Sequence, residues 1–145
     1  MDVTTSHVLV PLDGSPLADE ALTHALETFD CRITVLNVIT PIDGTMSEGS
    51  KLGIDQERRE SAHKRADELI ESARERADSF DQSIETGVET GEPAETILGF
   101  VGDNDVDHIV MGSHGGSSGA LTRRLLGTVT TAVVGEAPFP VTIVR

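Results

Sequence analysis

Short apolar runs that alternate with segments of helical periodicity constrain the fold of this chain more than any other feature. The first run, His7 to Val10, ends at a proline and an Asp-Gly turn, which is typical of a buried central strand. Ser15 then provides a helix N-cap with Pro16 at the first helical position, and the next apolar run extends from Ile33 to Ile39. Strand, helix and strand in this order predict a βαβ unit with parallel strands and a right-handed crossover.

The same alternation continues to the end of the chain. The patterns predict, in order, a long helix, an edge strand, a third helix, a fourth strand, a last helix and a final strand, at residues 55–79, 83–89, 93–103, 108–111, 121–135 and 141–144. At 145 residues the chain suits one domain, residues 1–145. The predicted fold class is therefore α/β, with a single doubly wound, five-stranded parallel sheet and helices on both faces.

The stretch from Asp107 to Thr128 passes from an apolar strand into a loop rich in glycine and serine, and then re-enters helix near Leu121. Glycines let backbone N–H groups approach a phosphate, and the start of a helix favours negative charge, so this pattern is typical of an anion site. A Walker loop is excluded because Ala120, rather than a lysine, follows Gly119. A dinucleotide-binding fingerprint is excluded because residues 13–16, Asp-Gly-Ser-Pro, follow the first strand.

Two segments are placed to form a ligand crevice. Ligands of doubly wound sheets bind outside the carboxyl ends of the strands, at the point where the strand order reverses. Residues 11–13 follow the first strand and residues 112–114 follow the fourth. The two segments flank one crevice if strands one and four are neighbours in the sheet.

The glycine-rich stretch resembles the nucleotide loop of the universal stress protein family, written G-x2-G-x9-G-[ST]. Gly112 and Gly115 match its first half and Gly127 with Thr128 matches its second half, although residues 116–126 make the intervening segment two residues longer than the pattern. Other segments are also similar to that family, at residues 8–15, 35–39, 91–93, 107–115 and 137–141. The resemblance therefore covers nearly the whole chain.

The resemblance implies the adenine nucleotide alpha-hydrolase-like fold with strand order 3-2-1-4-5, and a site for ATP or another adenine nucleotide with Mg²⁺ or Mn²⁺. In that site Asp13, beside Pro11, would contact the adenine or the ribose, and the backbone of Val38 would bind the adenine edge. The residues along the ribose and the phosphates would be Met111, Gly112, Ser113, His114, Gly115, Gly127 and Thr128, with Val129 adjoining. From the residues alone, a turn-capping role for Asp13 and an exposed loop position for His114 stay open.

Three functions are compatible with these motifs. The first is an ATP-binding stress-response or regulatory protein that uses the bound nucleotide as a signal. The second is a slow ATP hydrolase, for which Asp13 and His114 are available but no Walker aspartate pattern is present. The third is a ligand-free dimeric interaction module of the same family. The longer loop favours it, and the retained motif residues Gly112, Gly115, Gly127 and Thr128 disfavour it.

The charge of the chain excludes one class of partner. The formal net charge is −14, so the phosphate backbone of a nucleic acid would be repelled. Lys51 and Lys64 are the only lysines beside 25 acidic residues, a composition that resembles the cytoplasmic proteins of halophiles. Such self-repulsion predicts that salt screening stabilises the compact state.

The chain also lacks the marks of export. No run is long and apolar enough to span a membrane, and no basic region precedes the first apolar run as in a signal peptide. The single Cys31 cannot form an internal disulfide, so we expect a cytoplasmic protein in which Cys31 begins the second strand as a buried small hydrophobe.

The final strand predicts an assembly. Val141 to Val144 has no later strand to cover it, so it should lie at a sheet edge with unpaired backbone groups. A second copy of the chain is the natural cover, paired antiparallel across a two-fold axis. We therefore expect a homodimer through the C-terminal strand, as is common in the family that the chain resembles.

Overall fold

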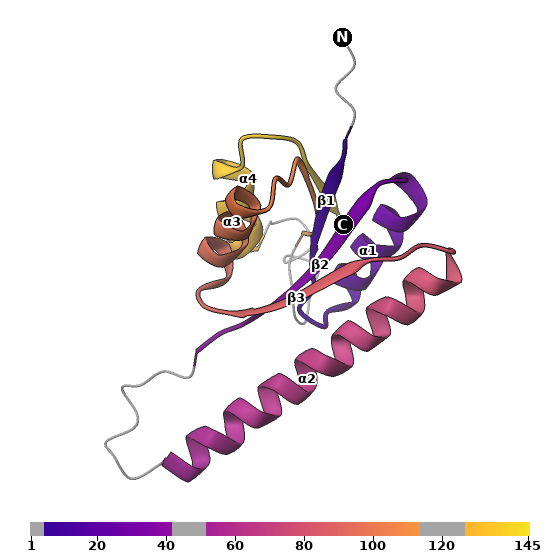
Figure 1. Ribbon diagram of the computed structural model, residues 1–145. Helices are drawn as coiled ribbons and strands as arrows, with labels where there is room; N and C mark the ends of the chain where they lie inside the picture. The colour runs from indigo at the N-terminus through magenta and orange to yellow at the C-terminus, as the bar shows by residue number, and fades with distance from the viewer. Residues whose placement is uncertain (1–4, 42–51, 114–126) are drawn as a thin grey trace.

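The computed structural model describes residues 5–41, 52–113 and 127–145. Its strands form one parallel sheet in the order β3-β2-β1-β4-β5, which confirms the predicted fold class and strand order (Figure 1). The strands are β1 (His7–Pro11), β2 (Arg32–Ile39), β3 (Glu85–Thr90), β4 (His108–Gly112) and β5 (Val141–Val144). The helices are α1 (Pro16–Thr28), α2 (Leu52–Ser79), α3 (Pro93–Asp103) and α4 (Thr128–Glu136).

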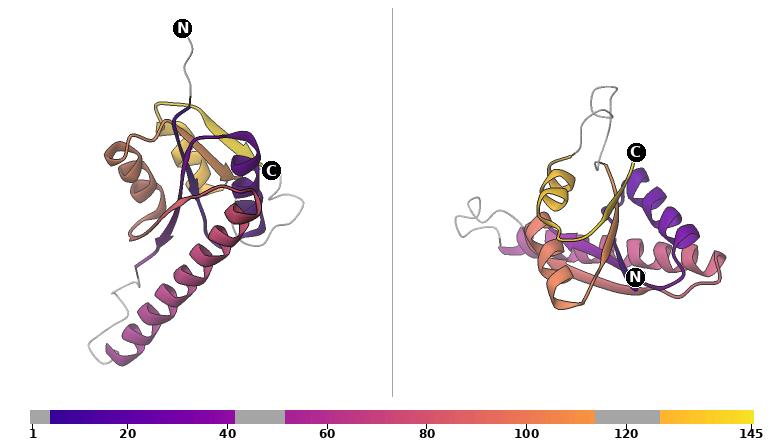
Figure 2. Two further views of the ribbon diagram at one scale, coloured as in Figure 1. Left: turned by 45° about the vertical axis from the view of Figure 1, so that its right-hand side comes forward. Right: turned by 90° about the horizontal axis from the view of Figure 1, so that it is seen from above.

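Helices cover both faces of the sheet, because consecutive residues of a strand point to opposite faces. Val8 and Val10 of β1 pack with α1 and α2, whereas Leu9 between them packs with α3 and α4. The views agree that α1 and α2 lie on one side of the sheet and α3 and α4 on the other (Figures 1 and 2). The central strands are therefore packed on both faces, and the loops at their carboxyl ends follow directly from buried residues.

The start of α4 differs from the predicted start of the last helix. We expected helix to continue through Gly127 and Thr128, but Gly127 has an extended backbone (φ −68°, ψ 168°) and α4 begins at Thr128. A glycine has no side chain to favour the helix and is accepted at the N-cap, which explains the late start. The expected beginning near Leu121 lies outside the described residues.

The position of Cys31 is a second correction. Cys31 precedes β2 rather than beginning it, and its side chain is partly rather than fully buried. Burial raises the pKa of its thiol, and the carboxylates of Asp107 and Asp30 raise it further. The thiol is therefore protonated at neutral pH, which agrees with a structural role.

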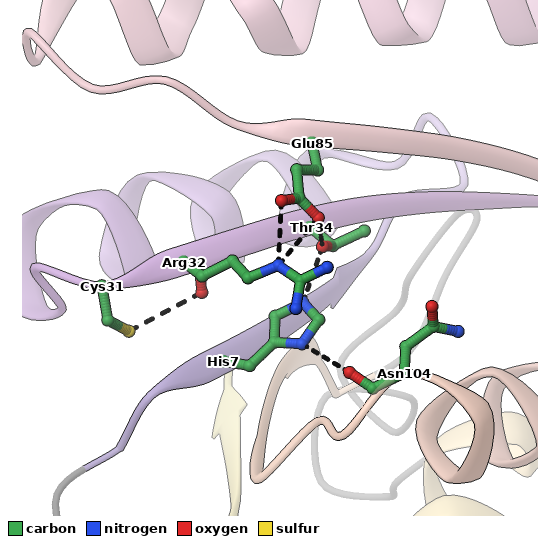
Figure 3. Close-up of polar contacts among 6 residues, drawn as sticks. All are labelled: His7, Cys31, Arg32, Thr34, Glu85 and Asn104. Atoms are coloured by element: carbon green, nitrogen blue, oxygen red, sulfur yellow. Dashed lines mark hydrogen bonds and ion pairs between the residues drawn. The ribbon is translucent and has the colours of Figure 1, made fainter.

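A chain of polar contacts ties the amino ends of the strands together (Figure 3). His7 is 2% exposed, and its Nδ1 donates to the carbonyl oxygen of Asn104 (2.9 Å), while its Nε2 lies 2.7 Å from the Thr34 hydroxyl. The Thr34 hydroxyl also contacts the Glu85 carboxylate (3.2 Å), which accepts from Nε of Arg32 (2.9 Å). These contacts join β1, β2, β3 and the end of α3, so polar groups secure this edge of the sheet.

The carboxylate of Asp107 fixes β1 to the start of β4 at the same edge. It accepts hydrogen bonds from the Ser6 N–H (3.0 Å), the Ser6 hydroxyl (2.9 Å) and the His7 N–H (3.1 Å). Burial raises the pKa of Asp107, but these donors outweigh burial and the pKa lies below its usual value. The contribution to stability is therefore present above the pKa of the unfolded chain and is lost as the pH falls through the folded pKa.

We expect Asp107→Asn to lower the free energy of unfolding at pH 7 by about 1–2 kcal/mol, because the charge that strengthens these hydrogen bonds is removed. Urea denaturation at pH 7 and at about pH 3, below the usual pKa of an Asp in an unfolded chain, measures the difference between wild type and variant, which should shrink at the lower pH. Asp67→Asn, on the exposed face of α2, removes the same charge as a control. A difference that does not depend on pH would contradict the assigned role of Asp107.

Candidate functional site

A cavity of about 210 Å³ lies at the carboxyl edge of the sheet, beside the ends of β1, β2 and β4 and the first turns of α3 and α4. β1 and β4 are neighbours in the sheet, with Leu9 beside Ile109, so the predicted crevice at the reversal of strand order exists. Seven of the predicted site residues line this cavity: Pro11, Asp13, Val38, Met111, Gly112, Gly127 and Val129.

The other predicted residues do not line it or lie outside the description. Ser113 is 1% exposed, its hydroxyl has no hydrogen-bond partner within the described structure, and its N–H donates to the Val144 carbonyl (2.8 Å). Thr128 is exposed at the first position of α4 and is not among the lining residues. His114 and Gly115 fall outside the described residues.

The segment after β1 is held against β2 by two hydrogen bonds. The Leu12 N–H donates to the Leu36 carbonyl (2.9 Å), and Nδ2 of Asn37 donates to the Leu12 carbonyl (2.8 Å). Asn37 is 7% exposed, so this amide is a buried brace. These bonds fix the position at which Asp13 reaches the mouth of the cavity.

Asp13 has the turn-capping role that the sequence left open. Its Oδ1 accepts a hydrogen bond from the Ser15 N–H (2.9 Å), and the Ser15 hydroxyl accepts from the Ala18 N–H (3.2 Å) to cap α1. The carboxylate is exposed and also lines the cavity. Capping the turn and contacting a ligand are therefore compatible roles for this side chain.

The interior of the cavity is mainly apolar. Leu36 and Val38 of β2, Ile97 of α3 and Met111 of β4 contribute apolar side chains to the wall. Such a surface suits a flat nucleobase, because ligand pockets are lined mostly by apolar groups with a few placed polar groups.

The first turn of α4 places backbone N–H groups that have no acceptor within the helix at one end of the cavity. Gly127 is an N-cap without a side-chain cap, and the first N–H bonded within the helix is that of Thr131, which donates to the Gly127 carbonyl (2.9 Å). The N–H groups of Thr128, Val129 and Thr130 therefore have no acceptor within the helix. Together with the helix dipole, they make this end of the cavity suitable for an anion such as phosphate.

Not every backbone donor of the motif is free. The Gly127 N–H donates to the Ser113 carbonyl (2.7 Å), and the Thr130 hydroxyl donates to the Gly112 carbonyl (3.0 Å). These two bonds fasten the start of α4 to the end of β4. A phosphate would consequently meet the three N–H groups of the first turn rather than that of Gly127.

Sequence reasoning missed several residues of the wall. Thr40, Pro93, Ile97 and Thr130 line the cavity but were not predicted. Thr40 follows the second strand and Pro93 opens the helix after the third, and both positions lie at the carboxyl edge of a parallel sheet. That rule alone, applied to every strand, would have found these two residues.

The described residues contain neither a cluster of metal ligands nor a helix that could span a membrane. Within residues 5–41, 52–113 and 127–145, no group of three or more His, Cys, Asp and Glu side chains is placed to hold a metal ion. Over the same ranges, the helices are too short or too polar to cross a bilayer.

Comparison with known proteins gives a consistent result. The chain matches the universal stress protein family over residues 4–145. It is 31% identical to universal stress protein MJ0531 of Methanocaldococcus jannaschii over 143 residues, which cover 95% of this chain and 81% of that protein. Its fold is similar to that of UspA from Lactobacillus plantarum, with a TM-score of 0.87, 22% identity, and coverage of 99% of this chain and 100% of that chain.

A further solved structure of similar fold contains a nucleotide. It is a universal stress protein family protein from Arabidopsis thaliana with AMP bound. The TM-score is 0.69 at 21% identity, and the match covers 96% of this chain and 90% of that chain. At this identity the likeness is one of fold.

Proposed function

This chain belongs to the universal stress protein family, and from that premise we propose that it binds an adenine nucleotide, ATP or a close relative, in the cavity at the carboxyl edge of the sheet. The single observation that carries the proposal is an apolar hollow that ends at the uncapped first turn of α4. An apolar wall and a row of N–H groups without an acceptor in the helix match the two halves of a nucleotide. A family structure with AMP bound supports the same ligand class.

The proposed pose follows from the chemistry of each wall. The adenine packs against the apolar side chains and takes hydrogen bonds from the backbone at Val38, which lines the wall. A ribose hydroxyl donates to the carboxylate of Asp13, a good acceptor at the mouth. The phosphates lie at the N–H groups that begin α4, with His114 and Gly115 as further phosphate contacts and Mg²⁺ or Mn²⁺ bound chiefly by phosphate oxygens.

We further propose that the nucleotide acts as a regulatory signal in a stress response, in the cytoplasm. Slow hydrolysis of ATP stays a prediction: of the described residues that line the cavity, Asp13 is the one carboxylate, and His114 is outside the description. The ligand-free module is disfavoured, because seven predicted contact residues surround one cavity. Adaptation to high salt also stays a prediction.

Mass spectrometry of the natively purified protein tests the nucleotide. We expect an adenine nucleotide to be released on denaturation in an amount approaching that of the protein. A protein that carries no nucleotide and shows no thermal shift with millimolar ATP would contradict the proposal. Guanine or cytosine nucleotides in its place would contradict the assignment of the base.

We also propose a homodimer through β5. β5 pairs with β4 and lies at the edge of the described sheet. The carbonyls of Pro140 and Val144 accept hydrogen bonds from the N–H groups of Ile109 in β4 and of Ser113 directly after it. Since successive backbone groups of a strand alternate, the carbonyls of Val141 and Ile143 point outward. An antiparallel copy of β5 would pair with these groups.

The side chains of β5 limit the choice of variant. Val141 and Ile143 pack against the core beside α3 and α4, so a charge at Ile143 would also damage the fold. We expect Val141→Pro to convert the dimer into a monomer of 15.4 kDa, because proline removes an N–H group that points outward from the sheet edge. The control variant Val141→Thr keeps this N–H group and should remain a dimer. Light scattering in high salt measures the mass, and circular dichroism checks the fold. A wild-type monomer, or a folded Val141→Pro dimer, would refute the interface.

A further inference from the structure

A second cavity, of about 240 Å³, lies between α2 and the carboxyl end of β2. It shares Asp13, Val38 and Thr40 with the proposed nucleotide cavity, so these three residues form a common rim. α2 begins beyond the end of β2 and runs back along it (Figure 1). A ligand that fills the first cavity therefore reaches the border of the second.

The strand side of the second cavity carries hydrogen-bond acceptors. Nδ2 of Asn37 donates to the Leu12 carbonyl (2.8 Å), which leaves Oδ1 of this buried amide as its acceptor. The carboxylate of Asp13 is a second acceptor, on the shared rim. These groups suit the hydroxyl of a sugar and would repel an anion placed directly against them.

The helix side carries a cation. Arg65 lines the second cavity from α2, together with Ala62 and Leu69 on the same helical face. The ion pairs among the described residues join Arg32 to Glu85 and Arg74 to Glu71, and Arg65 belongs to neither. The chain has a net charge of −14, so the guanidinium of Arg65 at this cavity would attract an anion to a specific place on an otherwise acidic protein. The geometry of its N–H donors matches the oxygens of a phosphate.

Resting on the proposed nucleotide site, we propose that the second cavity binds a second phosphate group, carried on the ribose of the bound adenine nucleotide. A ribose has two adjacent hydroxyl positions. One hydroxyl donates to Asp13 on the rim, and a phosphate on the other extends past the rim to Arg65. The ligand class is an adenosine 5′-phosphate with a further phosphate at the 2′ or 3′ position.

Calorimetric titration with three probes tests this assignment: AMP, adenosine 2′,5′-bisphosphate and adenosine 3′,5′-bisphosphate. For the wild-type protein, one bisphosphate should bind roughly tenfold more tightly than AMP, the effect of one charge-assisted contact. Arg65→Gln should abolish this ratio. Arg59→Gln removes the same charge from an exposed position of α2 that does not line the cavity, and it should keep the ratio.

The outcomes separate this inference from the proposed function. If AMP binds and neither bisphosphate binds more tightly, the second phosphate site is refuted while the nucleotide site stands. If none of these nucleotides binds and ATP does not bind either, both are refuted. If ATP alone binds, the second phosphate site is refuted while the nucleotide site stands. Inorganic phosphate is a fourth probe: if it alone binds in a manner that depends on Arg65, the site takes free anions and the link to the ribose is wrong.

Discussion

Gly127→Val is expected to weaken ATP binding by at least about a hundredfold, close to 2.7 kcal/mol, while the protein stays folded. Gly127 lines the cavity directly before the three N–H groups of α4 that have no acceptor within the helix. A branched side chain there would stand between these donors and a phosphate. Its backbone (φ −68°, ψ 168°) is extended, a conformation that valine adopts without strain, so the fold should tolerate the change.

A matched control lies in the same helix. Gly135→Val makes the same substitution near the other end of α4, where nothing lies within 4 Å of an added Cβ and no cavity wall is present. Titration with ATP should show loss of binding in Gly127→Val and wild-type binding in Gly135→Val. A folded Gly127→Val protein that binds ATP normally would show that the phosphates do not lie at this helix.

The second large effect concerns stability. A Cβ on Gly112 would lie 2.9 Å from Cβ of Leu17 and 3.1 Å from its backbone carbonyl carbon. These atoms belong to the body of α1 and cannot turn aside, so we expect Gly112→Ala to lower the free energy of unfolding by about 1–3 kcal/mol. The glycine of the motif is thus required by the packing of α1 on β4, whatever ligand is present.

For Gly99→Ala, the same substitution at another glycine, we expect the opposite change in the free energy of unfolding. Gly99 lies in the interior of α3 with nothing within 4 Å of an added Cβ, so alanine should stabilise the protein by about 0.5–1 kcal/mol. Urea denaturation of both variants should give changes of opposite sign. Equal effects would mean that close packing at Gly112 does not limit the residue at that position.

Much of the fold was predictable because apolar runs report burial directly. The run from Val8 to Val10 is fully buried, as a strand covered on both faces must be. The edge positions of β3 and β5 also agreed with their weak alternation and terminal place in the chain. Pro11, Asp13 and Gly112 were found because the carboxyl-edge rule depends only on where strands end. Val38, Met111, Gly127 and Val129 were predicted from the resemblance to the universal stress protein family.

The remainder depends on contacts between segments far apart in sequence. Nothing near Gly112 indicates that Leu17 will lie against it, and nothing near Asp107 indicates that Ser6 will donate to it. The predicted helix was carried through Gly127 without a break, whereas the backbone of Gly127 itself is extended. Such positions are decided by tertiary packing, which local propensity does not contain.

Calorimetric titration of the wild-type protein with ATP and Mg²⁺ in high salt tests the proposed nucleotide site most directly. We expect saturable binding with about one nucleotide per chain, at a concentration well below millimolar. Absence of heat, together with an unchanged melting temperature at millimolar ATP, would contradict the assignment of this cavity as a nucleotide site.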